Sequence, residues 1–181
     1  MNIQINTELS QKCPDITLSC ILADVRFEKM NADLWYEIET EMEAIRHKPL
    51  YATPSKIPAI AESRLAYKAL GKDPARYRLS AEALIRRILQ GKAIYQINNV
   101  VDLLNLTSIK TGFSIGGYNA NAIEGDVLLR IGKKKEPYEA IGRGELNILY
   151  LPTFTDEKGP FGTPTSDSVR TMVKQKVKTF L

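Results

Sequence analysis

The sequence predicts a single α/β domain in which helices and strands are mixed. Apolar residues recur at helical spacing between about residues 31 and 110, whereas runs with strand character follow residue 119. The length of 181 residues suits one domain with one sizeable core. A hydrophobic content of 44% and a charged content of 25% are typical of globular proteins. We therefore expect residues 1–181 to form one domain, and the apolar run that ends at Leu181 indicates that this domain continues further.

The sequence as a whole also indicates the cellular compartment. No stretch reaches the ~18 to 20 apolar residues that a membrane span requires. The N-terminus lacks the basic and then apolar pattern of a signal peptide. Cys13 and Cys20 are the only cysteines, and two thiols without a secretion signal usually stay reduced. We expect a soluble, cytoplasmic protein that has no membrane partner.

The first third of the chain predicts one strand and one helix. Apolar and polar residues alternate from Ile16 to Phe27, which indicates a strand. Asn31 is a suitable N-cap for a helix that runs to about Lys48. The apolar stripe of this helix consists of Leu34, Ile38, Met42 and Ile45. Three prolines then enforce a loop, namely Pro49, Pro54 and Pro58.

Two further helices follow this loop. The first begins at Ser55 or Pro58 and stops at Gly71, a residue type that commonly ends helices. The second has Ser80 as its predicted cap and is closed by Gly91. A short basic connector joins the two.

A fourth helix spans about Asn99 to Lys110 and carries polar groups within an apolar pattern. Gly112 lies just past its end. Asn98, Asp102 and Asn105 are spaced by four and three residues, so they share one helix face. Their side chains are suited to hydrogen-bonding a ligand, and helix capping and internal hydrogen bonds are the structural alternative.

The last third of the chain has the residue composition of strands and turns. Residues 126–131 (DVLLRI) and 145–151 (ELNILYL) are predicted strands. Residues 159–168 (GPFGTPTSDS) are a predicted loop on composition. The final run, which includes Val177 and Phe180, is a predicted strand.

Charge is distributed unevenly along the chain, which has a formal net charge of +4. Residues 24–43 contain seven acids and two bases, whereas residues 56–92 contain nine bases and three acids. The second region is suited to attracting a polyanion such as nucleic acid, with a solvated helix surface as the alternative. The arginines that we expect to contact phosphate are Arg76, Arg78, Arg86 and Arg87.

Several familiar kinds of chemistry are missing from the sequence. His47 is the only histidine, and it stands at the end of an acidic helix, so a Ser-His-Asp or Cys-His site is not expected. A zinc site needs three or four clustered Cys and His ligands, which this chain does not offer. The phosphate-binding lysine motif and the GxGxxG motif are also missing. We expect no metal and no cofactor.

Two clusters remain as candidate binding groups. Gly116 and Gly117 allow positive φ and close backbone approach, so their N–H groups are suited to facing a carbonyl or phosphate, although paired glycines commonly just form a turn. Tyr118 follows them and could stack on a base or sugar. Further on, Arg170 could pair with Asp167 or contact phosphate.

Read together, residues 97–132 (INNVVDLLNLTSIKTGFSIGGYNANAIEGDVLLRIG) resemble the B3/B4 domain of the phenylalanyl-tRNA synthetase β subunit. The helix that starts at Ser80 and the stretch 166–171 (SDSVRT) are similar to the free-standing branch of that family. The matching positions are Asn99, Val101, Asp102, Asn105, Gly112, Tyr118, Asn119, Gly125, Asp126 and Arg130. The synthetase pattern has a histidine where this chain has Gly116.

The resemblance implies a sandwich in which layered helices cover β-sheet, and an editing site for mischarged tRNA. The implied partner is tRNA or aminoacyl-tRNA, whose ester could be hydrolysed by positioning water and by stabilising the oxyanion with backbone N–H groups. The implied catalytic positions are Asn105, Gly116 and Gly117. The implied substrate-binding positions are Asn98, Asp102, Tyr118, Asn119, Phe161, Gly162 and Arg170.

Three hypotheses of function remain open at this point. The first is a free-standing editing hydrolase that acts on aminoacyl-tRNA. The second is a tRNA-binding module without catalysis, and the third is a protein that binds a small ligand similar to an amino acid.

Overall fold

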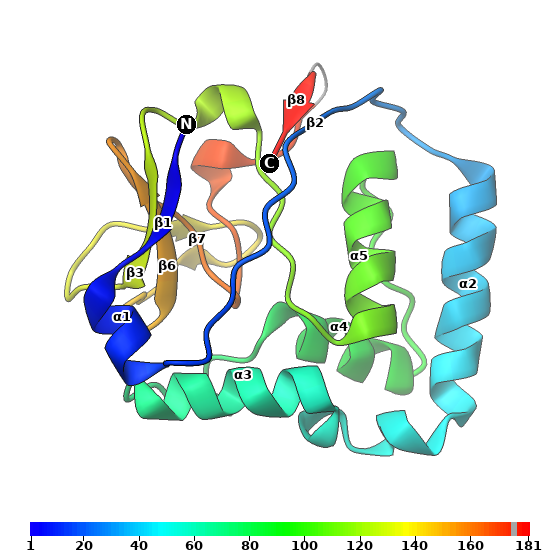
Figure 1. Ribbon diagram of the computed structural model, residues 1–181. Coiled ribbons are helices and arrows are strands. Elements are labelled where there is room, and N and C mark those ends of the chain that lie inside the picture. The colour runs from blue at the N-terminus through cyan, green and yellow to red at the C-terminus, as the bar shows by residue number, and fades with distance from the viewer. Residues whose placement is uncertain (175–176) are drawn as a thin grey trace.

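The computed structural model describes residues 1–174 and 177–181, and it is built from a sheet and a group of helices that lie side by side (Figure 1). The four-stranded sheet lies on one side of the molecule, and α2 (Ala32–His47), α4 (Ser80–Leu89) and α5 (Asn99–Thr111) lie on the other. Helix α3 (Pro58–Ala69) runs along the lower edge of Figure 1 from the sheet side towards the helical side. The mixed α/β class that the sequence predicts is confirmed.

The main sheet has the strand order β1-β3-β6-β7. Its strands are β1 (Ile3–Ile5), β3 (Val127–Ile131), β6 (Pro152–Asp156) and β7 (Gly159–Gly162). Strand β1 is parallel to β3, and the other pairs are antiparallel. Helix α1 (Thr7–Lys12) follows β1 and packs beside β3. The sheet therefore joins the N-terminus of the chain to its last third.

The sequence predicted only one strand of this sheet correctly. The predicted strand at residues 126–131 is confirmed as β3. Residues 145–151 are not one strand, because the backbone turns at Tyr150, which has a φ of 68°, and β6 begins only at Pro152. The loop predicted at residues 159–168 begins with β7, an edge strand, where a proline such as Pro160 is tolerated.

The four predicted helices are present, and their ends follow from local chemistry. The side-chain oxygen of Asn31 accepts the Leu34 N–H at 3.0 Å and caps α2, as predicted. Gly112 ends α5 in the left-handed region, with a φ of 79°. The predicted cap of α4 is wrong, because Ser80 is already helical and its N–H donates to the Pro164 carbonyl at 2.8 Å.

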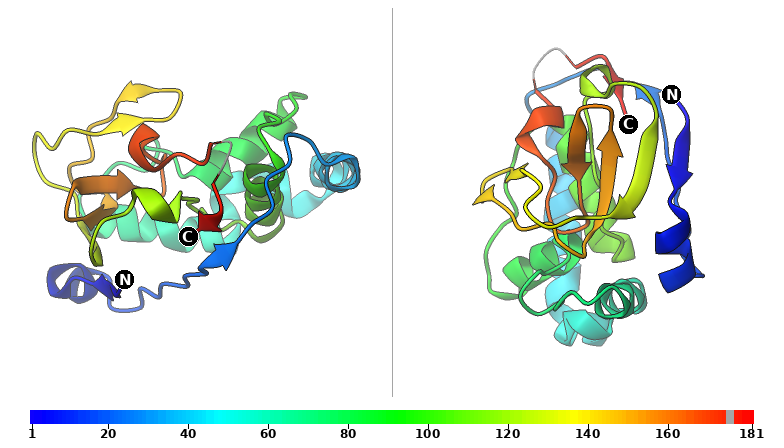
Figure 2. Two further views of the ribbon diagram at one scale, coloured as in Figure 1. Left: turned by 90° about the horizontal axis from the view of Figure 1, so that it is seen from above. Right: turned by 90° about the vertical axis from the view of Figure 1, so that its left-hand side faces the viewer.

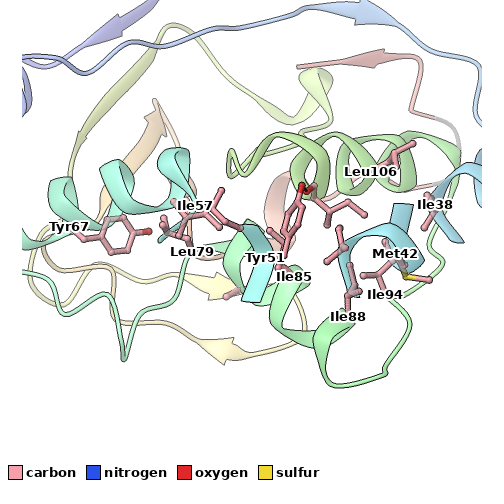
Figure 3. Close-up of a cluster of buried hydrophobic side chains, with 14 of the residues drawn as sticks. Ile38, Met42, Tyr51, Ile57, Tyr67, Leu79, Ile85, Ile88, Ile94 and Leu106 are labelled. Carbon is pink, nitrogen blue, oxygen red and sulfur yellow. Dashed lines mark hydrogen bonds between the residues drawn. The ribbon is translucent and has the colours of Figure 1, made fainter. Parts of the chain in front are cut away.

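The main hydrophobic core extends from the place where α2, α4 and α5 meet to the side of α3 that carries Tyr67, as Figure 3 shows. It contains Ile38 and Met42 from α2, Ile85 from α4 and Leu106 from α5. Each such side chain contributes about 1.5–3 kcal/mol when it is fully buried. Tyr51 anchors the loop between α2 and α3 to this core by donating its hydroxyl to the Ile109 carbonyl at 3.3 Å.

The segment predicted as a strand at residues 16–27 is mostly an extended strap without a sheet partner. Figures 1 and 2 show it running along one face of the molecule from α1 to α2. Only β2 (Ala23–Asp24) pairs, with β8 (Thr179–Phe180). Apolar and polar residues alternate along this strap because Ile16 and Leu18 pack inward against a small core that includes Leu9 and Leu129.

The remaining elements are short. The strands β4 (Glu139–Ala140) and β5 (Gly144–Glu145) form a separate hairpin. The 3₁₀ helices are η1 (Pro49–Ala52), η2 (Pro54–Lys56), η3 (Ala120–Ala122) and η4 (Val169–Thr171). Among residues 1–174 and 177–181, no helix has both the length and the apolar character needed to cross a bilayer.

Candidate functional site

The linker from Gly112 to Asn119 connects α5 to η3, and it is an extended segment rather than the glycine turn that the sequence predicts. Gly112 has a positive φ, but Gly116 and Gly117 do not. The expectation that this glycine pair uses left-handed backbone is therefore wrong. Their role is to provide space, as the side chains around them show.

Gly116 and Gly117 lie against side chains that leave no room for a Cβ atom. A Cβ on Gly116 would lie 2.0 Å from the Tyr118 hydroxyl oxygen and 3.1 Å from Asp167 Oδ1. A Cβ on Gly117 would lie 2.4 Å from Leu104 Cδ1. The histidine that the synthetase pattern carries at position 116 does not fit beside Tyr118 in this arrangement.

The linker holds a short row of backbone donors without partners. Gly117 N–H donates to Asp167 Oδ2 at 3.2 Å, and Tyr118 N–H donates to the Leu181 carbonyl at 2.8 Å. The N–H groups of Ser114, Ile115 and Gly116 make no hydrogen bond with any residue that the structure describes. The free donors therefore begin two residues before the predicted pair and include only its first member.

Asp167 is the titratable group at the end of this row. Its Oδ2 accepts the Gly117 N–H, and the Tyr118 hydroxyl lies beside the carboxyl group. Burial raises the pKa of Asp167 from its ordinary value of 3.8 to about 7, although the Gly117 N–H and the Tyr118 hydroxyl act in the opposite direction. A carboxyl group of this kind is populated in both protonation states near neutral pH.

A groove of about 1050 Å³ lies beside the start of the linker. Its walls come from residues 12–18, which join the end of α1 to the strap, from α3, from Phe113 and Ser114 of the linker, and from the sheet. Phe154 of β6 lines the groove, and its ring centroid lies 6.0 Å from that of Tyr118. Phe154 therefore lies between the groove and Tyr118, and Tyr118 and Asp167 do not themselves line the groove.

Two of the predicted ligand-binding groups on α5 are used by the fold. The side chain of Asn98 accepts the N–H groups of Val100 and Val101 and caps the helix. The carboxylate of Asp102 is fully buried and accepts Trp35 Nε1–H at 2.8 Å and Ile97 N–H at 2.9 Å. These partners leave neither side chain facing solvent, so their assignment to ligand binding gains no support.

The predicted aromatic and glycine contacts lie inside the molecule. Tyr118 is 5% exposed and packs edge-on against Phe161, whose centroid is 4.9 Å away, so it is not placed to stack on a base. Phe161 is fully buried. Gly162 is needed because a Cβ there would lie 2.1 Å from the Tyr118 hydroxyl oxygen. These residues enclose Tyr118, whose hydroxyl lies beside Asp167.

Arg170 and Asn119 also serve local structure. Arg170 binds Asp156 with both terminal nitrogens, at 2.8 and 3.1 Å. The pairing of Arg170 with Asp167 that the sequence allows is therefore wrong. Asn119 caps η3 by accepting the Asn121 N–H at 3.2 Å.

Asn105 is the predicted polar group on α5 that has no such role. It is partly exposed, and its side chain makes no hydrogen bond within the described part of the chain. It follows Leu104, whose methyl group lies against Gly117 of the linker. Its amide remains available to a ligand.

The predicted phosphate contacts divide into two pairs. Arg86 binds the fully buried Glu82 at 2.9 Å, and Arg87 donates to the Ala93 carbonyl and lies over the ring of Tyr95. Arg76 and Arg78 are exposed and form no ion pair among the residues described. Of the four predicted phosphate contacts, only Arg76 and Arg78 have guanidinium groups without an ion pair or hydrogen bond among the described residues, and Arg76 lies 5.8 Å from the ring centroid of Tyr77.

Sequence reasoning missed the groove and the role of Asp167. The groove walls come from segments that are far apart along the chain, such as Ile16, Ala66 and Phe154. Asp167 lies 50 residues from its partner Gly117. The only available signal was its place in a run of serine and threonine residues. Within the described residues, the structure has no group of three or more His, Cys, Asp or Glu side chains suited to a metal.

Comparison with known proteins agrees with the resemblance seen in the sequence. The family model described as the B3/4 domain matches residues 62–181. This match begins within α3 and includes α4, α5, the linker, β3 to β8 and Asp167. No curated protein matches the chain. Because the family model covers most of the sequence, this chain belongs to the B3/4 domain family.

Proposed function

We propose that this protein binds the aminoacyl end of a tRNA beside the linker and hydrolyses the ester that joins the amino acid to the ribose. The observation that carries this proposal is the row of unpartnered N–H groups at Ser114, Ile115 and Gly116. Hydrolysis of an ester passes through a tetrahedral oxyanion, which a backbone N–H donor of this kind stabilises. Membership in the B3/4 domain family supports the same direction.

The groove supplies a place for the amino-acid part of the substrate. Apolar side chains such as Leu65, Phe113 and Phe154 line it, and Lys12 and Glu62 add charges of both signs. An amino acid that lies in the groove would bring its ester to the neighbouring N–H groups. Asn105 is the proposed side-chain contact from α5, and Gly116 and Gly117 keep the linker narrow enough for close approach.

Exposed Arg76 and Arg78 are the proposed contacts to the tRNA backbone. Phosphate contacts make binding depend steeply on salt concentration. The steepness grows with the number of contacts, so binding through only two arginines should depend weakly on salt concentration. This weak dependence distinguishes the surface from an extended nucleic-acid-binding face.

The experiment is single-turnover deacylation, with the purified protein in large excess over tRNAs that each carry a different amino acid. We expect at least one charged tRNA to lose its amino acid faster than in buffer alone. Ile115→Pro removes the middle N–H donor, and Ile115→Ala keeps it as the matched control. Removing one oxyanion donor typically lowers a rate by ~100- to 1000-fold. Equal rates for the two variants would contradict the role of this donor.

A second candidate is the binding of a free ligand similar to an amino acid. It is favoured because Arg86 binds Glu82 and Arg87 binds the Ala93 carbonyl, so two of the four predicted phosphate contacts are already occupied within the protein. Calorimetric titration with free amino acids and with uncharged tRNA separates the two candidates. Binding of an amino acid without any binding of tRNA at low salt would replace the first proposal with the second.

A further inference from the structure

We infer that Asp167 is the proton acceptor of this hydrolysis, and that its carboxylate takes a proton from the water that attacks the ester carbonyl. The inference rests on the proposed function and adds the group that activates the water. It also assigns Tyr118 as a positioning residue, because its hydroxyl lies beside the carboxylate and lowers the pKa of Asp167.

The position of Asp167 relative to the linker supports this role. Oδ2 accepts the Gly117 N–H at 3.2 Å, and Oδ1 lies 3.1 Å from the place where a Cβ of Gly116 would be. The carboxylate therefore lies beside the backbone of Gly116 and Gly117. An ester carbonyl held by a linker donor would bring an attacking water within reach of this carboxylate. Because a carboxylate has about four acceptor sites, the hydrogen bond from Gly117 N–H leaves room for that water.

Within residues 1–174 and 177–181, no cationic side chain pairs with Asp167. Tyr118 faces it from the linker, and Tyr138 faces it from the segment before β4. The Cys20 thiol of the strap lies near Tyr118. Arg170 is directed to Asp156 instead. Because Asp167 forms no ion pair with any described residue, burial dominates and raises the pKa of Asp167 to about 7.

The reaction balances without a metal or a second reactant. The oxygen of water forms a bond to the carbonyl carbon while one of its protons passes to Asp167. The carbonyl oxygen becomes an oxyanion that the linker N–H groups hold. The intermediate then collapses, the bond between the carbonyl carbon and the ribose oxygen breaks, and Asp167 returns its proton to that oxygen. The products are the free amino acid and a tRNA with a free ribose hydroxyl.

The first test is the pH profile of single-turnover deacylation, after the rate in buffer alone is subtracted. A base must be ionised to accept a proton, so the wild-type rate should rise with pH and level off above about 7. Asp167→Asn should lower the rate at high pH by about 100-fold or more, and it should remove the bend near pH 7 from the dependence of the rate on pH. Binding of the charged tRNA should change little. Asp33→Asn, on the exposed surface of α2, is the matched control.

The second test uses Tyr118→Phe, which keeps the ring but removes the hydroxyl. The hydroxyl stabilises the ionised carboxylate, so its loss should raise the pKa of Asp167 and move the bend to higher pH. A residue that only packed the core would change the rate without moving the bend. NMR titration of the Asp167 carboxyl carbon gives the same pKa without any substrate, and it should report a midpoint near 7 in the wild type.

The outcomes separate this inference from the proposed function. A wild-type deacylase whose rate and bend are unchanged in Asp167→Asn would overturn the inference and leave the proposed function intact. The same holds for an Asp167 carboxyl that titrates near its ordinary value of 3.8. A wild-type protein that binds charged tRNA but hydrolyses none would overturn both the hydrolysis and the role of Asp167.

Discussion

Replacing Asp167 with Asn should change the stability of the protein in a way that depends on pH. In the folded chain burial raises the pKa of this carboxyl to about 7, whereas the unfolded chain has the ordinary value of 3.8. Between these values the unfolded chain has released the proton and the folded chain still holds it. The wild-type protein therefore loses stability as the pH rises from about 4 to about 7, and the loss is complete above that range.

The magnitude follows from the two pKa values. Each pKa unit corresponds to about 1.4 kcal/mol, so the interval from 3.8 to about 7 corresponds to up to about 4 kcal/mol. Asparagine keeps an acceptor for Gly117 N–H but carries no charge at any pH. The free energy of unfolding of Asp167→Asn, minus that of the wild type, should therefore increase with pH by up to this amount.

Urea denaturation of both proteins at several pH values between 4 and 9 measures this difference. Taking the difference between the two proteins removes the contribution of the other titrating groups. We expect the free energy of unfolding of the variant, relative to that of the wild type, to increase as the pH rises. Above about pH 8 this difference should stay constant. A difference that does not change with pH would refute the reasoning, because the carboxyl would then have the same pKa in both states.

Three further predictions concern the neighbouring residues. Asp156→Ala should lower the free energy of unfolding by about 3–5 kcal/mol, because it leaves the partly buried guanidinium of Arg170 without its carboxylate. A thermal melt equal to that of the wild type would contradict it. Gly116→Ala should cost about 1–3 kcal/mol, because the added methyl meets the Tyr118 hydroxyl at 2.0 Å. Its combination with Tyr118→Phe should recover part of that loss in urea denaturation, and strictly additive losses would count against the clash. Asn105→Ala should lower the deacylation rate more than the affinity for charged tRNA, and equal losses in a folded variant would remove Asn105 from the site.

The helices could be predicted because their signals are local. Asn31 and Asn98 cap helices through N–H groups two or three residues away, and Gly112 ends α5 by its own backbone conformation. Such contacts depend only on neighbouring residues, so the spacing of residue types reveals them. Ser80 shows the limit, because its N–H is satisfied by Pro164, far away in the chain.

The sheet was harder to predict, in part because some of its strands pair at long range. Ile3 pairs with Val127 across more than a hundred residues, and the alternating run Ile3–Ile5 is too short to indicate a strand by itself. The apolar run before Pro152 has strand composition, but the left-handed Tyr150 interrupts it. Pro160 and the glycines of β7 resemble a loop, since an edge strand tolerates residues that a central strand excludes.

The candidate site was predicted in part. The linker from Gly112 to Asn119 remains its centre, but most of the polar side chains chosen around it serve the fold. A sequence shows that Asp102 is polar and on a helix, but not that Trp35 will occupy its carboxylate. The role of Asp167 depends on burial, which is a property of the folded chain.

The most direct measurement of the central claim is the single-turnover deacylation of aminoacyl-tRNA by the wild-type protein and by Ile115→Pro, both at pH 8 with the protein in excess. The account predicts that the wild type hydrolyses at least one charged tRNA faster than buffer alone, and that the proline variant binds the same tRNA but hydrolyses it ~100- to 1000-fold more slowly. The absence of wild-type hydrolysis across all charged tRNAs would contradict the account.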